Sequence, residues 1–258
     1  MDSLVKLSAI CDFLGIDFSG DDFSVTGIST ASEIKEHTLI FTKDKNFDFL
    51  KKSKIIVICP KGSNMANGAC NFLEVNNPRL VFAKVVNKFF VKKIKPQIEK
   101  TTIIGQEVII GNNVYIGNNV VIGDNVKINQ GTIINANVVI ASNVTIGKDC
   151  YIKSGAIIGE DGFGFDFEED GTPVKFPQMG GVIIGDRVEI GAKCTIARGT
   201  IDDTVVLDDV KIDDQVHIAH NCFIGSKTII TACSELSGGV KIGDSCWLGP
   251  NSSIIQKV

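Results

Sequence analysis

The sequence predicts a mainly β protein, in which a parallel β-helix of six-residue repeats follows a small α/β domain. Isoleucine recurs at every sixth position from Ile104 to Ile158, and the spacing resumes at Ile184 and again at Ile212. Glycine, asparagine and aspartate fill the positions between the apolar residues, which is typical of turns. The first 98 residues lack this repeat and show helical and strand-like patterns instead.

Each repeat carries two inward side chains on a short strand. A small residue precedes each isoleucine by two positions, as Val114 precedes Ile116, and the residue between them faces outward. One unit is too short to bury its own apolar side, but stacked units pair at about 4.8 Å and bury it together. A spacing of six would place successive isoleucines on drifting faces of an α-helix, so a helical interpretation fails.

Composition excludes several classes of protein. The 258 residues include 26 Lys and Arg against 30 Asp and Glu, which is not the basic excess of a nucleic-acid-binding protein. No apolar run approaches the ~18 residues of a membrane-spanning helix, and the N-terminus lacks a signal-peptide pattern. We therefore expect a cytoplasmic protein without a transmembrane segment.

The eight cysteines show no CxxC spacing and form no Cys/His cluster in the sequence. Four of them occupy the small inward position of the repeat: Cys150, Cys194, Cys222 and Cys246. We expect reduced, buried thiols and no metal site.

Residues 1–98 predict the α/β domain. Apolar residues at helical spacing predict one helix over 4–14, which Gly15 ends, and a second helix over 80–90 after Asn77-Pro78. Short strands are predicted at 23–29, 39–42, 55–59 and 72–75.

Phe41 and Phe47 bracket a five-residue segment within this domain. Two phenylalanines six apart are by themselves more often core residues than a base-stacking pair. The stretch 37–47, together with Asn77-Pro78, resembles the uridine-binding domain of the UDP-3-O-acylglucosamine N-acyltransferases, which are hexapeptide-repeat acyltransferases. The resemblance implies that Phe41 and Phe47 sandwich the uracil and that Asp44 lies in the same site. Phe47 replaces the more usual Tyr, and Asp44-Lys45 replaces Asn-Pro.

The resemblance also implies a left-handed β-helix over 99–258, with triangular coils of eighteen residues, and assembly as a homotrimer. The repeat has ten copies in its first run, three in the second and eight in the third. At three repeats per coil, these copies predict seven coils.

The repeat is interrupted by an inserted loop at 160–181. This loop contains Asp161-Gly162-Phe163-Gly164-Phe165 and then Pro177-Gln178. Coil stacks tolerate surface loops, so the interruption alone indicates no more than a surface loop without a function. It resembles the DGFGF and PQ signature of the same family, which implies that Phe163 and Phe165 form a wall of the acceptor site.

Residues 197–204 and 211–221 resemble the family's RG-x-x-DDT and HIAHN segments. The repeat phase leaves His220 and Asn221 at a corner and directs His217 elsewhere. A lone histidine is usually structural. The resemblance implies instead that His220 is the catalytic base, with Asn221 beside it in the substrate site.

The reaction that the resemblance implies requires a base and an oxyanion donor. An amine attacks a thioester and loses a proton, for which an imidazole with a pKa near 6.5 is suited. The oxyanion needs a fixed N–H donor. One coil after His220 the stacked residue is Gly238, about 4.8 Å away, and the family assigns this role to the corresponding glycine. Nothing in this chemistry requires a metal.

We therefore predict an N-acyltransferase that moves a (3-hydroxy)acyl group from acyl carrier protein to UDP-3-O-acylglucosamine in lipid A biosynthesis. It has no tightly bound cofactor, and acyl-ACP or acyl-CoA is its co-substrate. The alternative is a CoA-dependent N-acetyl- or other small-acyl transferase that acts on a nucleotide-linked amino sugar for O-antigen or glycan synthesis.

Two departures from the family pattern favour the alternative: Ala197 replaces an Asp, and Gln256-Lys257 replaces Gly-His. The sequence also ends at Val258 without the family's further coils and C-terminal helices, which indicates either a truncated chain or a protein that uses a smaller donor. Two other classes fit less well. A zinc hydratase needs three His ligands, of which only His217 and His220 are present here, and a purely structural β-helix would need neither His220 nor the insertion.

Overall fold

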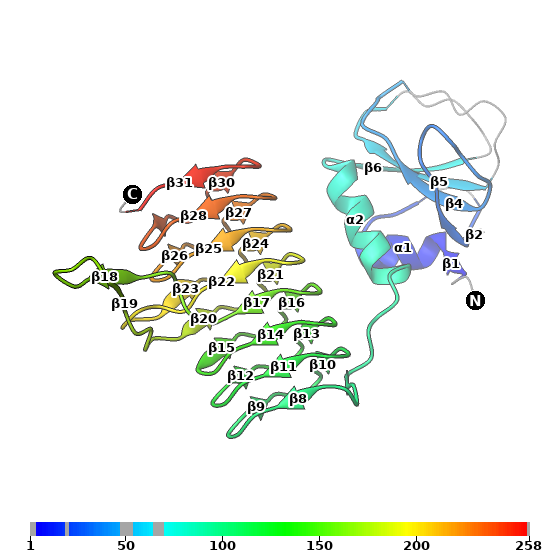
Figure 1. Ribbon diagram of the computed structural model, residues 1–258. Helices are drawn as coiled ribbons and strands as arrows, with labels where there is room; N and C mark the ends of the chain where they lie inside the picture. Colours follow the sequence, from blue (N-terminus) through cyan, green and yellow to red (C-terminus); the bar gives the residue numbers. More distant parts are fainter. Residues whose placement is uncertain (1–3, 19–20, 47–53, 64–69, 257–258) are drawn as a thin grey trace. The chain divides into compact units, whose positions relative to one another are not determined.

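The computed structural model describes residues 4–18, 21–46, 54–63 and 70–256. The chain forms two compact units, Met1–Lys93 and Ile94–Val258 (Figure 1). The second unit begins before residue 98, where the sequence analysis placed the boundary, because Gln97–Ile98 already pairs in register with Tyr115–Ile116.

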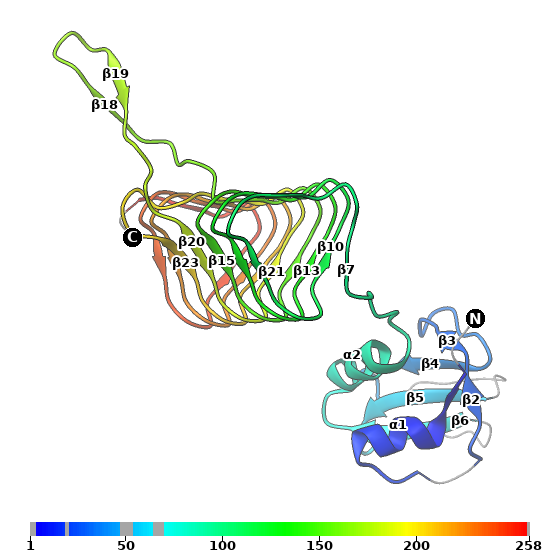
Figure 2. The same cartoon turned by 90° about the horizontal axis from the view of Figure 1, so that it is seen from below.

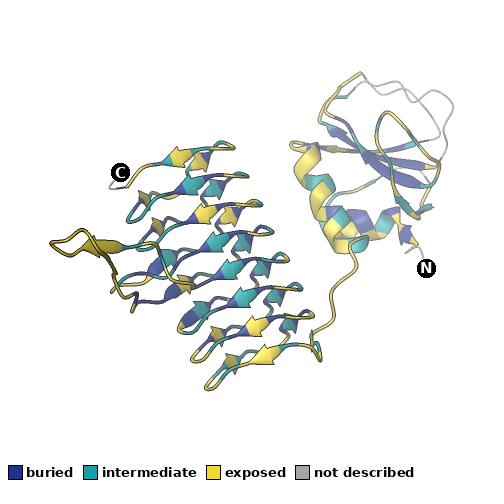
Figure 3. Ribbon diagram, viewed as in Figure 1, coloured by how far each residue is buried: buried dark blue, intermediate teal, exposed yellow. Residues whose placement is uncertain are grey.

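The first unit is a small α/β domain. Its parallel sheet has the order β3 (Gly27–Ile28), β4 (Thr38–Phe41), β5 (Ile55–Pro60) and β6 (Cys70–Val75). The short strands β1 (Val5–Lys6) and β2 (Ser24–Val25) pair antiparallel. Figure 3 shows β4 and β5 as largely buried, and only the last residue of each strand is partly exposed.

Two helices pack with this sheet. Helix α1 (Leu7–Leu14) begins three residues later than predicted, because Val5–Lys6 is a strand, and it ends at Gly15 with a φ of 65°. Helix α2 (Pro78–Phe89) is capped by the Asn77 side chain, which accepts a hydrogen bond from the Leu80 N–H. Within the described part of the chain, no helix has the length and hydropathy needed to cross a bilayer.

The second unit is a parallel β-helix whose strands form three sheets. The first sheet contains β7 (Gln97–Ile98), β10 (Tyr115–Ile116), β13 (Ile133–Ile134), β16 (Tyr151–Ile152), β21 (Glu189–Ile190), β24 (Lys211–Ile212), β27 (Ile229–Ile230) and β30 (Trp247–Leu248). The second contains β8 (Ile103–Ile104), β11 (Val121–Ile122), β14 (Val139–Ile140), β17 (Ile157–Ile158), β22 (Thr195–Ile196), β25 (His217–Ile218), β28 (Glu235–Leu236) and β31 (Ser253–Ile254). The third contains β9 (Ile109–Ile110), β12 (Lys127–Ile128), β15 (Val144–Ile146), β20 (Val182–Ile184), β23 (Thr204–Val206), β26 (Phe223–Ile224) and β29 (Lys241–Ile242).

The predicted fold class is confirmed, and the predicted coil count is too low. The sheets have eight, eight and seven strands, so the stack is longer than seven coils. The two strands that the repeat count missed are β7 and β23, which end at Ile98 and Val206. Strand β23 was not counted for two reasons. Residues 197–203 interrupt the repeat a second time just before it, and Val206 stands where the repeat has isoleucine.

The inward residues of the repeat form one continuous core. Ile116, Ile140 and Ile218 are fully buried, and stacked isoleucines pair in register, as Ile116 does with Ile134. All eight cysteines are free thiols. Burial raises the pKa of Cys150 and of Cys194 to about 11.

The expectation of buried thiols is wrong for Cys233, which is exposed, and Cys70 and Cys246 are only partly buried. Cys233 occupies a corner with a φ of 59°, a left-handed conformation that asparagine takes at several other corners of the stack, for example at Asn119 and Asn221.

The insertion forms a hairpin that projects from the coils, as Figure 2 shows. Its strands β18 (Phe165–Phe167) and β19 (Pro173–Lys175) pair antiparallel. The hairpin leaves the stack after β17 and returns at β20, so its base lies among the coils that carry the 211–221 segment.

Candidate active site

His220 lies at the corner between β25 and β26 and lines a pocket of about 380 Å³. The pocket brings together three residues that the sequence analysis selected: His220, Gly238 and Phe163. Its other walls include Ala197, Gln256 and the outward side chains of β22, β25 and β28.

Gly238 lies one coil after His220, as the eighteen-residue period predicts. The Gly239 N–H donates a hydrogen bond to the His220 carbonyl over 2.9 Å. A Cβ on Gly238 would lie 2.7 Å from both Nε2 and Cε1 of His220, so the imidazole covers the Cα of this glycine. None of the hydrogen bonds among the described residues uses the Gly238 N–H. This donor is therefore available beside the imidazole.

Asn221 determines which nitrogen of His220 carries the proton. The Asn221 Oδ1 accepts hydrogen bonds from the Thr200 N–H over 3.1 Å and the Thr200 hydroxyl over 2.7 Å, while its Nδ2 donates to the Asp202 carbonyl over 3.3 Å. A backbone N–H can only donate and a carbonyl can only accept, so the amide orientation is fixed. The His220 Nδ1 lies 3.0 Å from the same Oδ1 and must donate to it. Nε2 is then the nitrogen with a free lone pair, and it is the one that faces Gly238.

The inserted loop packs on a second side of the imidazole. A Cβ on Gly162 would lie 2.8 Å from Cβ and 2.9 Å from Cδ2 of His220. The ring is therefore enclosed between two backbone segments, one from the next coil and one from the insertion. Phe163 and Phe165 of this motif were predicted from the sequence and Gly162 was not, although it directly precedes Phe163.

The two selected phenylalanines of the loop differ in position. Phe163 lines the pocket and is 87% exposed. Phe165 lies on β18 with its ring centroid 4.9 Å from that of Phe163, so it supports the wall without being part of the pocket lining.

His217 does not point away from His220, contrary to the repeat-phase prediction. Both line the same pocket, because this pocket extends from the corner that carries His220 to the outward face of β25, which carries His217. His217 lies opposite Glu235 in register, and the Glu235 carboxylate accepts hydrogen bonds from the hydroxyls of Ser237 and Ser253. Glu235 was not predicted as a site residue, although the eighteen-residue period places it beside His217.

In the first unit, Phe41 lies at the carboxyl end of β4 and is half-buried. Its ring centroid is 4.9 Å from that of Phe82 on α2, so part of its surface belongs to the domain core. Asp44 is exposed, and its backbone N–H donates to the Thr42 hydroxyl. Phe47 lies outside the described residues, so the predicted aromatic pair stays a prediction.

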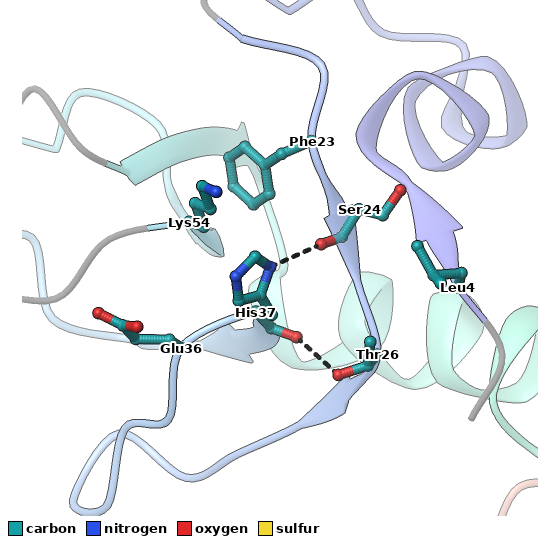
Figure 4. A pocket seen from close by; sticks show the side chains of 7 residues that line it. All are labelled: Leu4, Phe23, Ser24, Thr26, Glu36, His37 and Lys54. Atoms are coloured by element: carbon teal, nitrogen blue, oxygen red, sulfur yellow. Dashed lines mark hydrogen bonds between the residues drawn. The ribbon is translucent and has the colours of Figure 1, made fainter. Parts of the chain in front are cut away.

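A separate pocket of about 550 Å³ lies at the amino ends of β4 and β5 (Figure 4). His37 and Lys54, which directly precede these strands, line it, and the His37 Nδ1 donates to the Ser24 carbonyl over 3.3 Å. Phe41 is the last residue of β4, at its opposite end, and Asp44 follows it; neither lines this pocket. No motif in the sequence indicated this pocket.

Among the described residues, no group of three or more His, Cys, Asp and Glu side chains is placed to hold one metal ion.

Two families of repeats match the β-helix. Bacterial transferase hexapeptide (six repeats) matches residues 96–136 and 125–160, and Hexapeptide repeat of succinyl-transferase matches 181–202 and 215–256. The UDP-3-O-acylglucosamine N-acyltransferase of Coxiella burnetii (strain RSA 493 / Nine Mile phase I) is 36% identical over 259 residues, covering 90% of this chain and 74% of that protein. The chain belongs to the UDP-3-O-acylglucosamine N-acyltransferase family.

Other relatives match shorter segments. The UDP-3-O-acylglucosamine N-acyltransferase of Hahella chejuensis (strain KCTC 2396) is 50% identical over 103 residues, which are 40% of this chain and 29% of that protein. The crystal structure of LpxA from Acinetobacter baumannii aligns with a TM-score of 0.56 at 28% identity, over 62% of this chain and 60% of that one. The resemblance on which the sequence analysis relied is thereby confirmed, and membership of this family makes the chain a hexapeptide-repeat acyltransferase.

Proposed function

We propose that this acyltransferase transfers a (3-hydroxy)acyl group from a thioester to the amino group of UDP-3-O-acylglucosamine, a step of lipid A biosynthesis. The observation that carries the proposal is the His220 corner, where a base with a free Nε2 covers the Cα of Gly238, whose N–H makes no hydrogen bond to any other described residue. Membership of the UDP-3-O-acylglucosamine N-acyltransferase family supports the choice of substrate.

The geometry supports a direct transfer. The sugar amine attacks the thioester carbonyl, and Nε2 of His220 takes the proton that the amine loses as the C–N bond forms. The carbonyl oxygen becomes an oxyanion, to which the Gly238 N–H donates. When the C–S bond breaks, the imidazolium returns its proton to the leaving thiolate. Asn221 holds Nδ1–H throughout and so keeps Nε2 as the nitrogen that exchanges protons.

The proposed donor is acyl carrier protein, with no tightly bound cofactor. The proposed nucleotide contacts are Phe41, Phe47 and Asp44, and the proposed acceptor contacts are Phe163, Phe165 and Asn221. We further propose a cytoplasmic homotrimer. Support for assembly comes from apolar outward residues on the first coils, where Ile103 and Ile109 are 63% and 61% exposed.

A second candidate is a transferase that moves a small acyl group from CoA to another nucleotide-linked amino sugar. It is favoured by Ala197 and Gln256, which depart from the family pattern and both line the pocket. Lys257, the neighbouring departure, lies outside the described residues.

One experiment separates the two candidates. The full chain is incubated with UDP-3-O-acylglucosamine or with a UDP-linked amino sugar that lacks the O-acyl group, and each is paired with 3-hydroxyacyl-ACP or acetyl-CoA. Amide product is measured by mass spectrometry, with His220→Ala as the control. Product from acyl-ACP and the O-acylated acceptor supports the first candidate, and product from acetyl-CoA alone supports the second. Turnover by His220→Ala at the wild-type rate would refute the base in both.

A further inference from the structure

The inserted loop reaches the catalytic corner through Gly162. Its close approach to Cβ and Cδ2 of His220 means that the loop backbone limits how far the imidazole can turn away from Gly238. The opposite boundary is a coil of the β-helix, which the sheets hold in register. The insertion has no such ladder at its start, so a separate element must hold Gly162 in place.

Arg198 contacts each of the three residues that precede the motif glycine. Its Nε donates to the Gly159 carbonyl over 2.6 Å, its backbone N–H donates to the Glu160 carbonyl over 2.9 Å, and its guanidinium lies 3.8 Å from the Asp161 carboxylate. Its Nη2 donates to the Ser142 carbonyl on the coil before the loop, over 2.9 Å. The side chain is only 14% exposed.

These contacts require the shape of a guanidinium. Nε and Nη2 reach two carbonyls from different coils while the charge faces Asp161. A lysine ammonium is a compact point charge on a flexible stem and cannot reproduce this fork. Arg198 is absent from the pocket lining, so it acts on the reaction through the residues that it contacts.

We propose that Arg198 is a positioning residue for acyl transfer: it fixes residues 159–161, which hold Gly162 against His220, and thereby keeps the imidazole over Gly238. This inference rests on the proposed function, in which His220 is the base of the acyl transfer. It assigns the insertion a part in the catalytic geometry, in addition to its part in the acceptor wall.

The first test is independent of activity. In the full chain labelled with ¹⁵N-histidine, the His220 signals are assigned by comparison with His220→Ala, and its ring tautomer is read from two-bond ¹H–¹⁵N correlations. We expect one tautomer, with the proton on Nδ1, in the wild type and a mixture in Arg198→Gln. Lys175→Met is the matched control, because Lys175 also pairs with Asp161 but lies on the projecting hairpin. We expect it to retain the wild-type tautomer.

The second test is a double-mutant cycle of Arg198→Gln with Gly162→Ala. We expect each single change to lower kcat roughly ten- to a hundredfold with little change in KM, because a small displacement of a catalytic group has effects of this size. The double variant should be about as slow as the slower single variant, since both changes act on the same contact.

Three results would overturn the inference: an unchanged His220 tautomer in folded Arg198→Gln, an equal change in Lys175→Met, or additive losses in the cycle. If Arg198→Gln does not fold, Arg198→Lys is measured in the same way. If the wild-type chain acylates no amino sugar, the proposed function fails, whereas the tautomer comparison still decides the role of Arg198.

Discussion

The imidazole of His220 covers the Cα of Gly238, and a single methyl group added to that glycine would lie 2.7 Å from the His220 Nε2. The base and the candidate oxyanion donor therefore share one contact across adjacent coils. Their arrangement depends on glycine for its lack of a side chain, and the φ of Gly238 does not require glycine.

Gly238→Ala should consequently displace the imidazole and remove most of the activity. We expect kcat/KM to fall by about 10²–10³, the usual range for the loss of an oxyanion or acid–base contact. Gly243→Ala is the control, because a Cβ there meets nothing closer than the Cys246 Sγ at 3.9 Å. Steady-state kinetics and melting temperatures of both variants check the prediction, and a Gly238→Ala enzyme of wild-type activity would contradict it.

Asn221→Asp should change the pH dependence of the reaction. A carboxylate in place of the amide puts a negative charge beside the imidazole and stabilises its protonated form. The acidic limb of the kcat/KM profile should move to higher pH. Asn221→Gly keeps the left-handed backbone, whose φ is 59°, and removes the acceptor, so it should lower kcat without this shift. Identical profiles for wild type and Asn221→Asp would mean that Asn221 does not contact the titrating base.

Asp214 should stabilise the β-helix only above acidic pH. Its carboxylate accepts hydrogen bonds from the Ala192 N–H and from Lys153, and these contacts lower its pKa below the usual 3.8. A carboxylate whose pKa is lower in the folded than in the unfolded state stabilises the fold at pH values above its unfolded-state pKa. This stabilisation is lost as the pH falls through its folded-state pKa. Asp214→Asn should therefore lower Tm at pH 7 and have a smaller effect near pH 3. A Tm difference that is the same at both pH values would be the opposite result.

Phe41→Ala should weaken binding of UDP and also lower Tm. Loss of one stacking ring costs roughly 1–3 kcal/mol, or about tenfold in affinity, and loss of the contact with Phe82 destabilises the domain. Phe82→Ala is the matched control, since it should lower Tm with little effect on UDP affinity. Calorimetry with UDP and thermal melts of both variants distinguish the two roles. If both variants bind UDP as the wild type does, the predicted uridine site is wrong.

The period of the repeat made much of this structure predictable. It specifies which residues face inward and which residues stack, so it placed Gly238 on His220 without further information. It failed wherever the chain leaves the repeat. Gly162, Thr200 and Arg198 lie in the two interruptions, and their contacts with the His220 corner depend on loop paths that no period encodes. His217 was misplaced for a related reason, because the phase gives the direction of a side chain and not the extent of the hollow that it borders.

The spacing between paired coils also sets a distance within the active site. His220 and Gly238 lie on consecutive rungs, so the spacing of a β-sheet sets their separation and the length of the stack has no influence on it. Coils can be gained or lost at either end of such a β-helix while the separation of His220 and Gly238 stays the same. We therefore expect changes in substrate preference to be concentrated in the segments that interrupt the repeat, residues 160–181 and 197–203.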